Sequence, residues 1–256
     1  MAEIGNKYKI AILEFDTTSR MNHTGQKIVA ELKSNAKAEK AEWWNRYMKG
    51  EIPFLGVGIP EIRKMLLDLN RKERLEELAM NRQVGIVNGL IKSGLAEEKL
   101  AAILYIQLFW LANQKNSFLM SLISDWFDER YIFDWNTTDW LCVKVLTPMV
   151  DSGDPEVISR LKHWSRDPYL WKARASLVPF AQAGTMMDHT QEIKRFADIL
   201  IRREERFAKT AVGWVLREYS KHDEEFVLTF LSKHVKHTTA EVKRNALKYY
   251  RQRTRS

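Results

Sequence analysis

The sequence predicts an all-helical fold built from stacked helical pairs, and four observations support this prediction. Strand signals are nearly absent from the 256 residues. Apolar residues instead recur at helical spacing in successive segments, such as residues 97–114 and 208–222. Short runs that contain Gly, Pro, Ser or Asp separate these segments, and small residues recur at a nearly constant interval along the chain.

The repeat interval is marked by alanines that lie near the middle of successive expected helices. Ala102 lies in EEKLAAIL, Ala175 in LWKARASL, Ala211 in FAKTAVGW and Ala246 in EVKRNALK. The successive intervals are 73, 36 and 35 residues, so one member of the series is missing near residue 139. A helical pair that recurs at this interval is typical of a HEAT-like α-solenoid, in which small residues allow close packing of helices.

Asp139 occupies the position of the missing alanine. Burying a carboxylate without a partner costs roughly several kcal/mol, so the presence of an acid at this position has to be explained. One interpretation is an acid paired with a neighbouring Lys or Arg, or turned to solvent; the other is a functional acid on the exposed inner face of the solenoid. The same register aligns Trp135 with Trp171, Phe207 and Val242, and Arg174 with Thr138, Thr210 and Asn245.

The chain is expected to form a single domain over residues 1–256, with about six stacked pairs, because none of the separating runs has the length or composition of a linker. Residues 1–25 fit the repeat pattern poorly and are expected to form a loosely attached N-terminal extension.

Composition restricts the class of function. The chain has 41 Lys and Arg against 33 Asp and Glu, an excess that favours a polyanionic partner, although many soluble proteins carry as much.

Cys142 is the only cysteine, which excludes an internal disulfide and a Cys-x-x-Cys zinc site. No signal peptide or membrane-spanning run is recognisable, so we expect an intracellular protein, nucleoid-associated or cytoplasmic in a prokaryote and nuclear in a eukaryote. No motif implies a cofactor or a metal.

Aromatic and basic residues accompany Asp139 in the expected groove. Trp135 lies one helical turn before Asp139, where its ring could face a bound cation while the acid supplies the opposite charge. Trp214 and Arg217 are three residues apart and share a helix face, and Arg174 stands where other repeats carry short polar residues. The alternative is that both tryptophans belong to the core and that Arg217 is merely solvated.

Four stretches of the chain resemble the DNA alkylation repair family of HEAT-like-repeat DNA glycosylases. They are RYMKGEIPFLGVGIPEIRK, DWNTTD, WKARA and KTAVGWVLREYSK, and the resemblance covers about residues 41–250. It implies a right-handed, C-shaped solenoid with a basic concave face. It also implies a monofunctional enzyme of base excision repair that removes positively charged N3- and N7-alkylated purines, such as 3-methyladenine and 7-methylguanine, without drawing the base into a pocket.

The resemblance also implies roles for individual residues. The catalytic acid falls on Asp139, and the two tryptophans beside the lesion fall on Trp135 and Trp214. The arginine that grips a phosphate falls on Arg174. Contacts with DNA are further expected from Arg217 and from two residues of the front motif, Arg63 and Tyr47.

Two departures from the family pattern concern the middle motif. Asp134 stands where the family often has a second aromatic residue, and the segment between Trp135 and Asp139 is unusually polar. The expected partner is double-stranded DNA that contains alkylated purines, with no membrane, and the expected state is a monomer. The alternatives are a HEAT-repeat protein that binds nucleic acid without catalysis and a scaffold for protein interactions.

Overall fold

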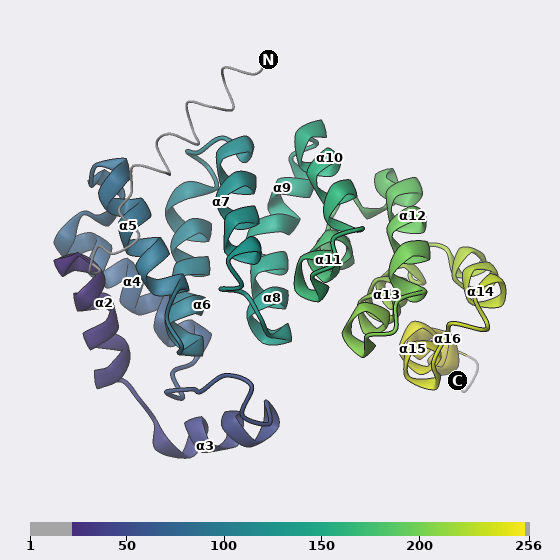
Figure 1. Cartoon of the computed structure of the whole chain (residues 1–256), viewed down its shortest axis with the longest axis horizontal. Coiled ribbons are helices and arrows are strands. Elements are labelled where there is room, and N and C mark those ends of the chain that lie inside the picture. The colour runs from purple at the N-terminus through teal and green to yellow at the C-terminus, as the bar shows by residue number, and fades with distance from the viewer. Residues whose placement is uncertain (1–21, 254–256) are drawn as a thin grey trace. The chain divides into compact units, whose positions relative to one another are not determined.

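The computed structural model describes residues 22–253, and within this range every regular element is a helix (Figure 1). The chain divides into two compact units, a first unit of Met1–Phe118 and a second unit of Leu119–Ser256. The all-helical prediction is therefore confirmed. Residues 1–21, most of the predicted N-terminal extension, lie outside the described residues, whereas α2 already begins at His23.

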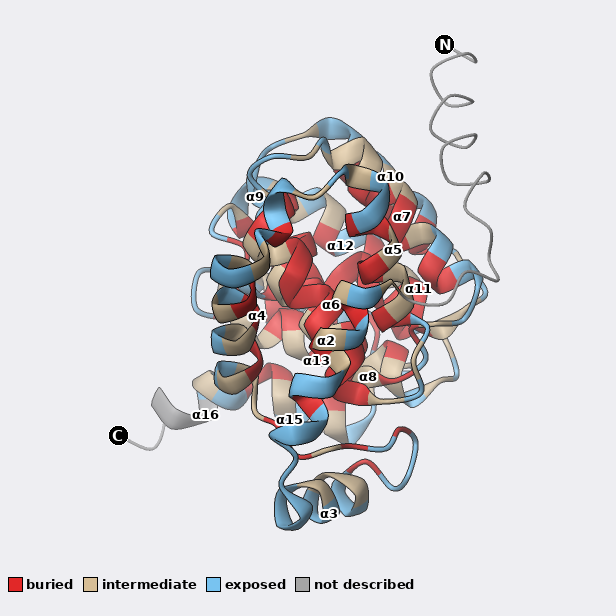
Figure 2. Cartoon of the chain, turned by 90° about the vertical axis from the view of Figure 1, so that its left-hand side faces the viewer, coloured by how far each residue is buried: buried red, intermediate tan, exposed pale blue. Residues whose placement is uncertain are grey.

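In the first unit, α2 packs against α4 and α5, and α6 packs against α4 and α5. Helix α3 lies apart from these four helices (Figures 1 and 2). The elements are α2 (His23–Ser34), α3 (Ala38–Tyr47), α4 (Ile59–Glu73), η1 (Leu75–Glu77), α5 (Met80–Ile91), α6 (Ala96–Tyr105) and η2 (Ile106–Trp110).

In the second unit, α8, α11, α13 and α15 pack against one another in that order. The elements are α7 (Asn116–Asp128, beginning three residues before the boundary), α8 (Trp135–Leu141), η3 (Cys142–Leu146), α9 (Thr147–Asp151), α10 (Pro155–Trp164), α11 (Leu170–Leu177), η4 (Val178–Gln182), η5 (Met186–His189), α12 (Thr190–Ile201), α13 (Arg206–Tyr219), α14 (Glu224–Lys233), α15 (Ala240–Ala246) and α16 (Lys248–Arg253).

The repeat register derived from the alanines is found in the structure. Ala102, Ala175, Ala211 and Ala246 lie on α6, α11, α13 and α15, each the second helix of a consecutive pair, and all four are fully buried. Asp139 lies at the same place on α8, which is the second helix of the pair formed by α7 and α8. The packing is that of an α-solenoid, as predicted. The right-handed, C-shaped course, the basic concave face and the single domain stay predictions.

Contacts between successive repeats of the second unit recur at the same interval. Each joins a residue to another one repeat away, as expected when equivalent helices stack in parallel layers. They include Tyr169 to Ile132, Arg174 to Asp139, Trp171 to Phe207, Arg203 to Asp167, Arg206 to Glu241 and Lys233 to Asp198.

The loop of the front motif is held by a buried carboxylate. Glu97, on the first turn of α6, is 1% exposed and accepts hydrogen bonds from the backbone N–H groups of Leu55, Gly56 and Val57. Gly56 has a φ of +83°, and a Cβ atom there would lie 2.3 Å from the carbonyl oxygen of Lys37. The loop therefore needs glycine at position 56. Through its bonds to Glu97, the loop connects α3 to α6.

Two helices pass directly into a π-helical turn, a feature that the sequence analysis did not predict. Helix α6 continues into η2 and α8 continues into η3, so the turns follow the second helices of two repeats. A π-turn inserts one extra residue per turn and often lies beside a functional site. The turn after α8 begins three residues beyond Asp139.

A buried histidine makes the stability of the second unit dependent on pH. The His234 side chain is 1% exposed, and its Nε2 lies 3.0 Å from Oδ1 of Asp198. Burial lowers the pKa of His234, although the Asp198 carboxylate opposes the shift. The folded state therefore favours neutral His234, and this contribution to stability is present above pH about 6.5 and decreases as the pH falls below it.

We expect the melting temperature to fall between about pH 7 and pH 5, and His234→Phe to reduce that dependence. The exposed His222→Gln variant is the matched control and should keep the native dependence. Equal slopes for the native protein and His234→Phe would contradict this assignment.

Candidate active site

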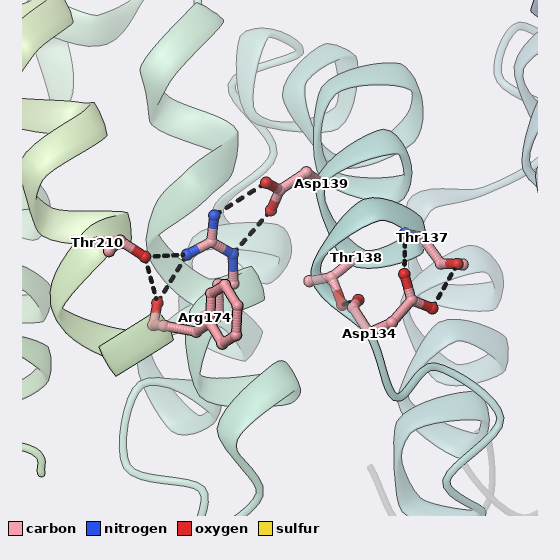
Figure 3. Close-up of polar contacts among 7 residues, drawn as sticks. Asp134, Thr137, Thr138, Asp139, Arg174 and Thr210 are labelled. Atoms are coloured by element: carbon pink, nitrogen blue, oxygen red, sulfur yellow. Dashed lines mark hydrogen bonds and ion pairs between the residues drawn. The ribbon is translucent and has the colours of Figure 1, made fainter. Parts of the chain in front are cut away.

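Helix α8 carries the candidate acid and begins at a buried N-cap. Asp134 is fully buried, and its Oδ1 accepts a hydrogen bond of 2.8 Å from the backbone N–H of Thr137. Its Oδ2 accepts a bond of 2.7 Å from the Thr137 hydroxyl, and the Thr138 hydroxyl donates to its carbonyl oxygen (Figure 3). Asp134, considered from the sequence only as a departure from the family pattern, thus fixes the start of the helix that positions Asp139.

Replacing Asp134 by Ala is expected to destabilise the second unit. The variant loses the N-cap, at a cost of about 0.5–2 kcal/mol, and leaves the buried Thr137 donors without their acceptor. The melting temperature should decrease by several degrees. Asp134→Ser keeps a capping oxygen and should therefore show a smaller decrease. The comparison is Asp154→Ala, which removes the less buried cap of α10. If Asp134→Ala melts at the same temperature as the native protein, the cap does not fix α8.

The Asp139 carboxylate is held in a two-bond contact with the Arg174 guanidinium. Nε of Arg174 donates to Oδ1 at 2.7 Å, and Nη2 donates to Oδ2 at 2.9 Å (Figure 3). The Asp139 side chain is 17% exposed and the Arg174 side chain only 5%. This fork-to-fork geometry fixes the plane of the carboxylate, while the Asp139 side chain as a whole remains partly exposed.

Arg174 also reaches the following repeat. Its Nη1 donates to the carbonyl oxygen of Phe207 at 2.6 Å and to the Thr210 hydroxyl at 3.2 Å. One buried side chain therefore joins α8, α11 and α13, because its bonds extend to the repeats on either side of its own. Four of its five N–H groups have an acceptor in this arrangement. The predicted phosphate contact of Arg174 stays a prediction.

The thiol beside this ion pair is inert. Cys142 is fully buried one turn after Asp139, and burial together with the nearby carboxylate raises the pKa of the thiol well above its usual range. The Arg174 charge opposes this shift without reversing it. Because the thiolate is the nucleophilic form, Cys142 does not provide nucleophilic chemistry at neutral pH.

The two predicted site tryptophans are partly exposed. Trp135 is the first residue of α8, and Trp214 lies on α13, where Ala211 and Val215 beside it are fully buried. Trp171, the equivalent of Trp135 in the next repeat, is buried and packs on Phe207 with ring centroids 5.2 Å apart. Trp135 and Trp214 are therefore both more accessible than Trp171.

Arg217 is partly exposed and lies in a charged cluster on α13. Its Nε donates to Glu218 at 2.8 Å and its Nη1 to the Asn245 side chain at 3.2 Å. Burial raises the pKa of Glu218, but hydrogen bonds from Lys221 and Arg217 outweigh it and hold this pKa below its usual value. Asn245 is the residue aligned with Arg174 two repeats earlier, so Arg217 also bonds to the following repeat.

Arg63 and Tyr47 belong to the first unit. Arg63, on α4, donates to the Gln107 side chain in the π-turn η2. Tyr47 ends α3 and is 56% exposed. The prediction that both contribute to one DNA-binding face with Arg174 stays a prediction. Among the described residues no group of three or more His, Cys, Asp or Glu side chains is placed to hold a metal ion, and no helix is long and apolar enough to cross a membrane.

Comparison with known proteins places the chain in a family. The family model described as DNA alkylation repair enzyme matches residues 28–250. A solved structure, the predicted DNA alkylation repair enzyme from Enterococcus faecalis, is 18% identical and matches with a TM-score of 0.71, covering 84% of this chain and 96% of that one. This likeness shows a shared fold. None of the curated proteins matches. Because the family model spans most of the sequence, the chain belongs to the DNA alkylation repair enzyme family.

Proposed function

We propose that the protein is a monofunctional DNA glycosylase that excises positively charged N3- and N7-alkylated purines and leaves an abasic site. Membership of the DNA alkylation repair family supports a role on alkylated DNA. The observation that carries the finer proposal is the Asp139 carboxylate. It stands where the other repeats carry a buried alanine, is oriented by Arg174, and remains partly exposed.

The chemistry of an alkylated purine explains why one fixed carboxylate, without a general acid, is sufficient for excision. Alkylation at N3 or N7 gives the base a positive charge, which makes it a good leaving group without protonation by a general acid. Positive charge then develops on the sugar as the glycosidic bond breaks. A fixed carboxylate stabilises this charge and orients or deprotonates the water that captures the sugar. Asp139 is the residue proposed for both tasks.

The contact with Arg174 suits Asp139 to this role. Each carboxylate oxygen accepts one hydrogen bond from the guanidinium, so each retains a lone pair that a water molecule could use. The rigid fork prevents rotation of the carboxylate, and a group that is already oriented needs no reorganisation in the transition state. Arg174 acts here as a positioning residue, since its bonds reach the acid and the neighbouring repeat.

Trp135 and Trp214 are proposed to provide aromatic faces for the cationic base or sugar, a contribution of about 0.5–2 kcal/mol each. Normal purines are neutral, so the site selects lesions by charge and needs no pocket for a flipped base. Arg217, Arg63, Tyr47 and a remaining donor of Arg174 are proposed to contact the backbone of double-stranded DNA, with the protein acting as a monomer.

Release of 3-methyladenine and 7-methylguanine from methylated duplex DNA tests the proposal. The purified protein should release both bases and leave abasic sites without cutting the strand. The exposed Asp188→Asn variant, which removes one carboxylate of the second unit outside the site, should retain the native rate. A protein that binds the DNA but releases no base above the spontaneous rate is not a glycosylase for these lesions.

A further inference from the structure

Helix α3 exposes a stacked pair of aromatic side chains. Trp43 is 51% exposed and Tyr47 is 56% exposed. Their rings are nearly parallel, with an angle of 14° between the planes and 5.0 Å between the centroids. No residue of α3 is buried, and Figure 2 shows the helix set apart from the buried helices of the first unit. Two adjacent exposed aromatic rings form a contiguous apolar patch, the kind of surface that is a candidate contact site.

The pair stands on a rigid support. Trp44 meets both rings edge-on, with ring centroids 5.0 Å from Trp43 and 5.8 Å from Tyr47. It also stacks on Phe54 with ring centroids 5.2 Å apart and planes at 13°. The Asn45 side chain accepts a bond of 3.0 Å from the backbone N–H of Phe54, and the N–H of Lys37 donates to the carbonyl oxygen of Leu55. The loop that makes these contacts is itself held by buried Glu97. The aromatic pair is therefore held in place before any partner binds.

The size of the exposed pair restricts the partner. Two aromatic side chains have about 150–250 Å² of surface each, and here about half of that is covered. A stable protein interface needs about 800 Å² on each side, so two rings alone do not supply one. A flat aromatic surface of this size matches one or two planar rings.

Charged residues surround the aromatic pair within about one turn. Lys40, Arg46 and Lys49 are exposed, as are Glu39, Glu42 and Glu51, so these six carry no net charge (three basic minus three acidic residues). Arg46 bonds to Glu42 at 2.9 Å on an exposed face, a pair that contributes little to stability and can exchange for another anion. Cations beside an aromatic surface are the combination that binds a base together with its phosphates.

We propose that Trp43 and Tyr47 form a stacking platform for an unstacked nucleobase of DNA, a contact separate from the Asp139 site. The inference rests on DNA as the substrate class of the family. It extends the expected DNA contact of Tyr47 to base stacking and adds Trp43, which the sequence analysis did not single out. Such a platform favours DNA in which a base has left the stack, whatever its sequence, because every base has a π-face.

The test compares two single strands of equal length, an oligothymidylate and a strand of abasic tetrahydrofuran nucleotides. Trp43→Ala should weaken binding to the oligothymidylate by about 5- to 100-fold and change binding to the abasic strand by less than about twofold. The salt dependence should be unaltered, because no phosphate contact is lost. Trp43→Phe should retain most of the affinity. Leu67→Ala, which truncates another exposed apolar residue of the first unit, should bind as the native protein.

Equal losses on both strands, or no loss on either, would overturn the platform. So would a native dimer that Trp43→Ala dissociates, since the pair would then serve self-association. The excision assay is independent of this result. If the native protein excises alkylated purines but Trp43→Ala binds the oligothymidylate as tightly as the native protein, the platform is refuted and the glycosylase proposal stands. If Trp43→Ala loses affinity only for the oligothymidylate but the native protein excises no base, the glycosylase proposal alone is refuted.

Discussion

Replacing Asp139 by Asn is expected to lower single-turnover release of 7-methylguanine by about 10²–10³-fold while DNA affinity stays nearly native. The amide keeps the shape of the carboxylate, but it lacks the charge that stabilises the developing sugar cation and is a poor base for water. It can also accept only one of the two bonds that Arg174 donates. The fold should persist at a lowered melting temperature, because the variant leaves the buried Arg174 charge without its counter-ion while Arg174 keeps its acceptors on the next repeat.

Thermal melting on the same preparation distinguishes this role from a purely structural one. If Asp139 serves only to pair with Arg174, the Asn variant will melt at a much lower temperature and yet release base at the native rate. Asp188→Asn controls for the loss of one negative charge from the second unit.

Replacing Arg174 is expected to affect both stability and catalysis. Arg174→Ala leaves the carboxylate of Asp139 without its partner and removes the bonds to Phe207 and Thr210, and breaking a buried pair in this way typically costs about 3–5 kcal/mol. Arg174→Lys keeps the charge but cannot form the two-bond fork. We therefore expect Lys to recover much of the stability and little of the excision rate, as measured by melting and single-turnover release.

The predicted phosphate contact of Arg174 is tested separately by measuring how tightly the native protein and Arg174→Ala bind DNA at several salt concentrations. Loss of a phosphate contact lowers the salt slope by about one unit, whereas loss of a positioning residue leaves it unchanged. If Arg174→Lys cleaves at the native rate, the fork geometry is irrelevant to catalysis and the positioning role is wrong.

The periodic part of the fold was predictable because its cause is local and repeated. Each alanine allows close packing of one helix pair on the next, so the interval between alanines gives the helix register without knowledge of the contacts. Asp139 was conspicuous for the same reason, since it interrupts that series. Asp134 also carried a recognisable signal, an Asp directly before a helix with a Thr three residues later, which favours an N-cap.

Other features depend on contacts that no local pattern encodes. The alignment placed Arg174 and Thr210 in equivalent positions of successive repeats, but the bond between them, and the fork to Asp139, depend on side-chain directions across helices. The π-turn after Asp139 has no propensity signature. Helical spacing likewise cannot separate an exposed tryptophan from a core tryptophan, so the exposure of Trp43 followed only from the position of α3.

The bonds of Arg174 to two flanking repeats have a consequence for how activity is lost on heating. A solenoid is stabilised by interactions between nearest neighbours, so its terminal repeats can fray while inner ones stay folded. When fraying reaches α13, the carbonyl of Phe207 and the hydroxyl of Thr210 leave Arg174, and the acid two repeats away loses its fixed orientation although α8 is intact. Inactivation should therefore precede the loss of helicity, and hydrogen exchange at α13, more than at α8, should follow the decline of activity with temperature.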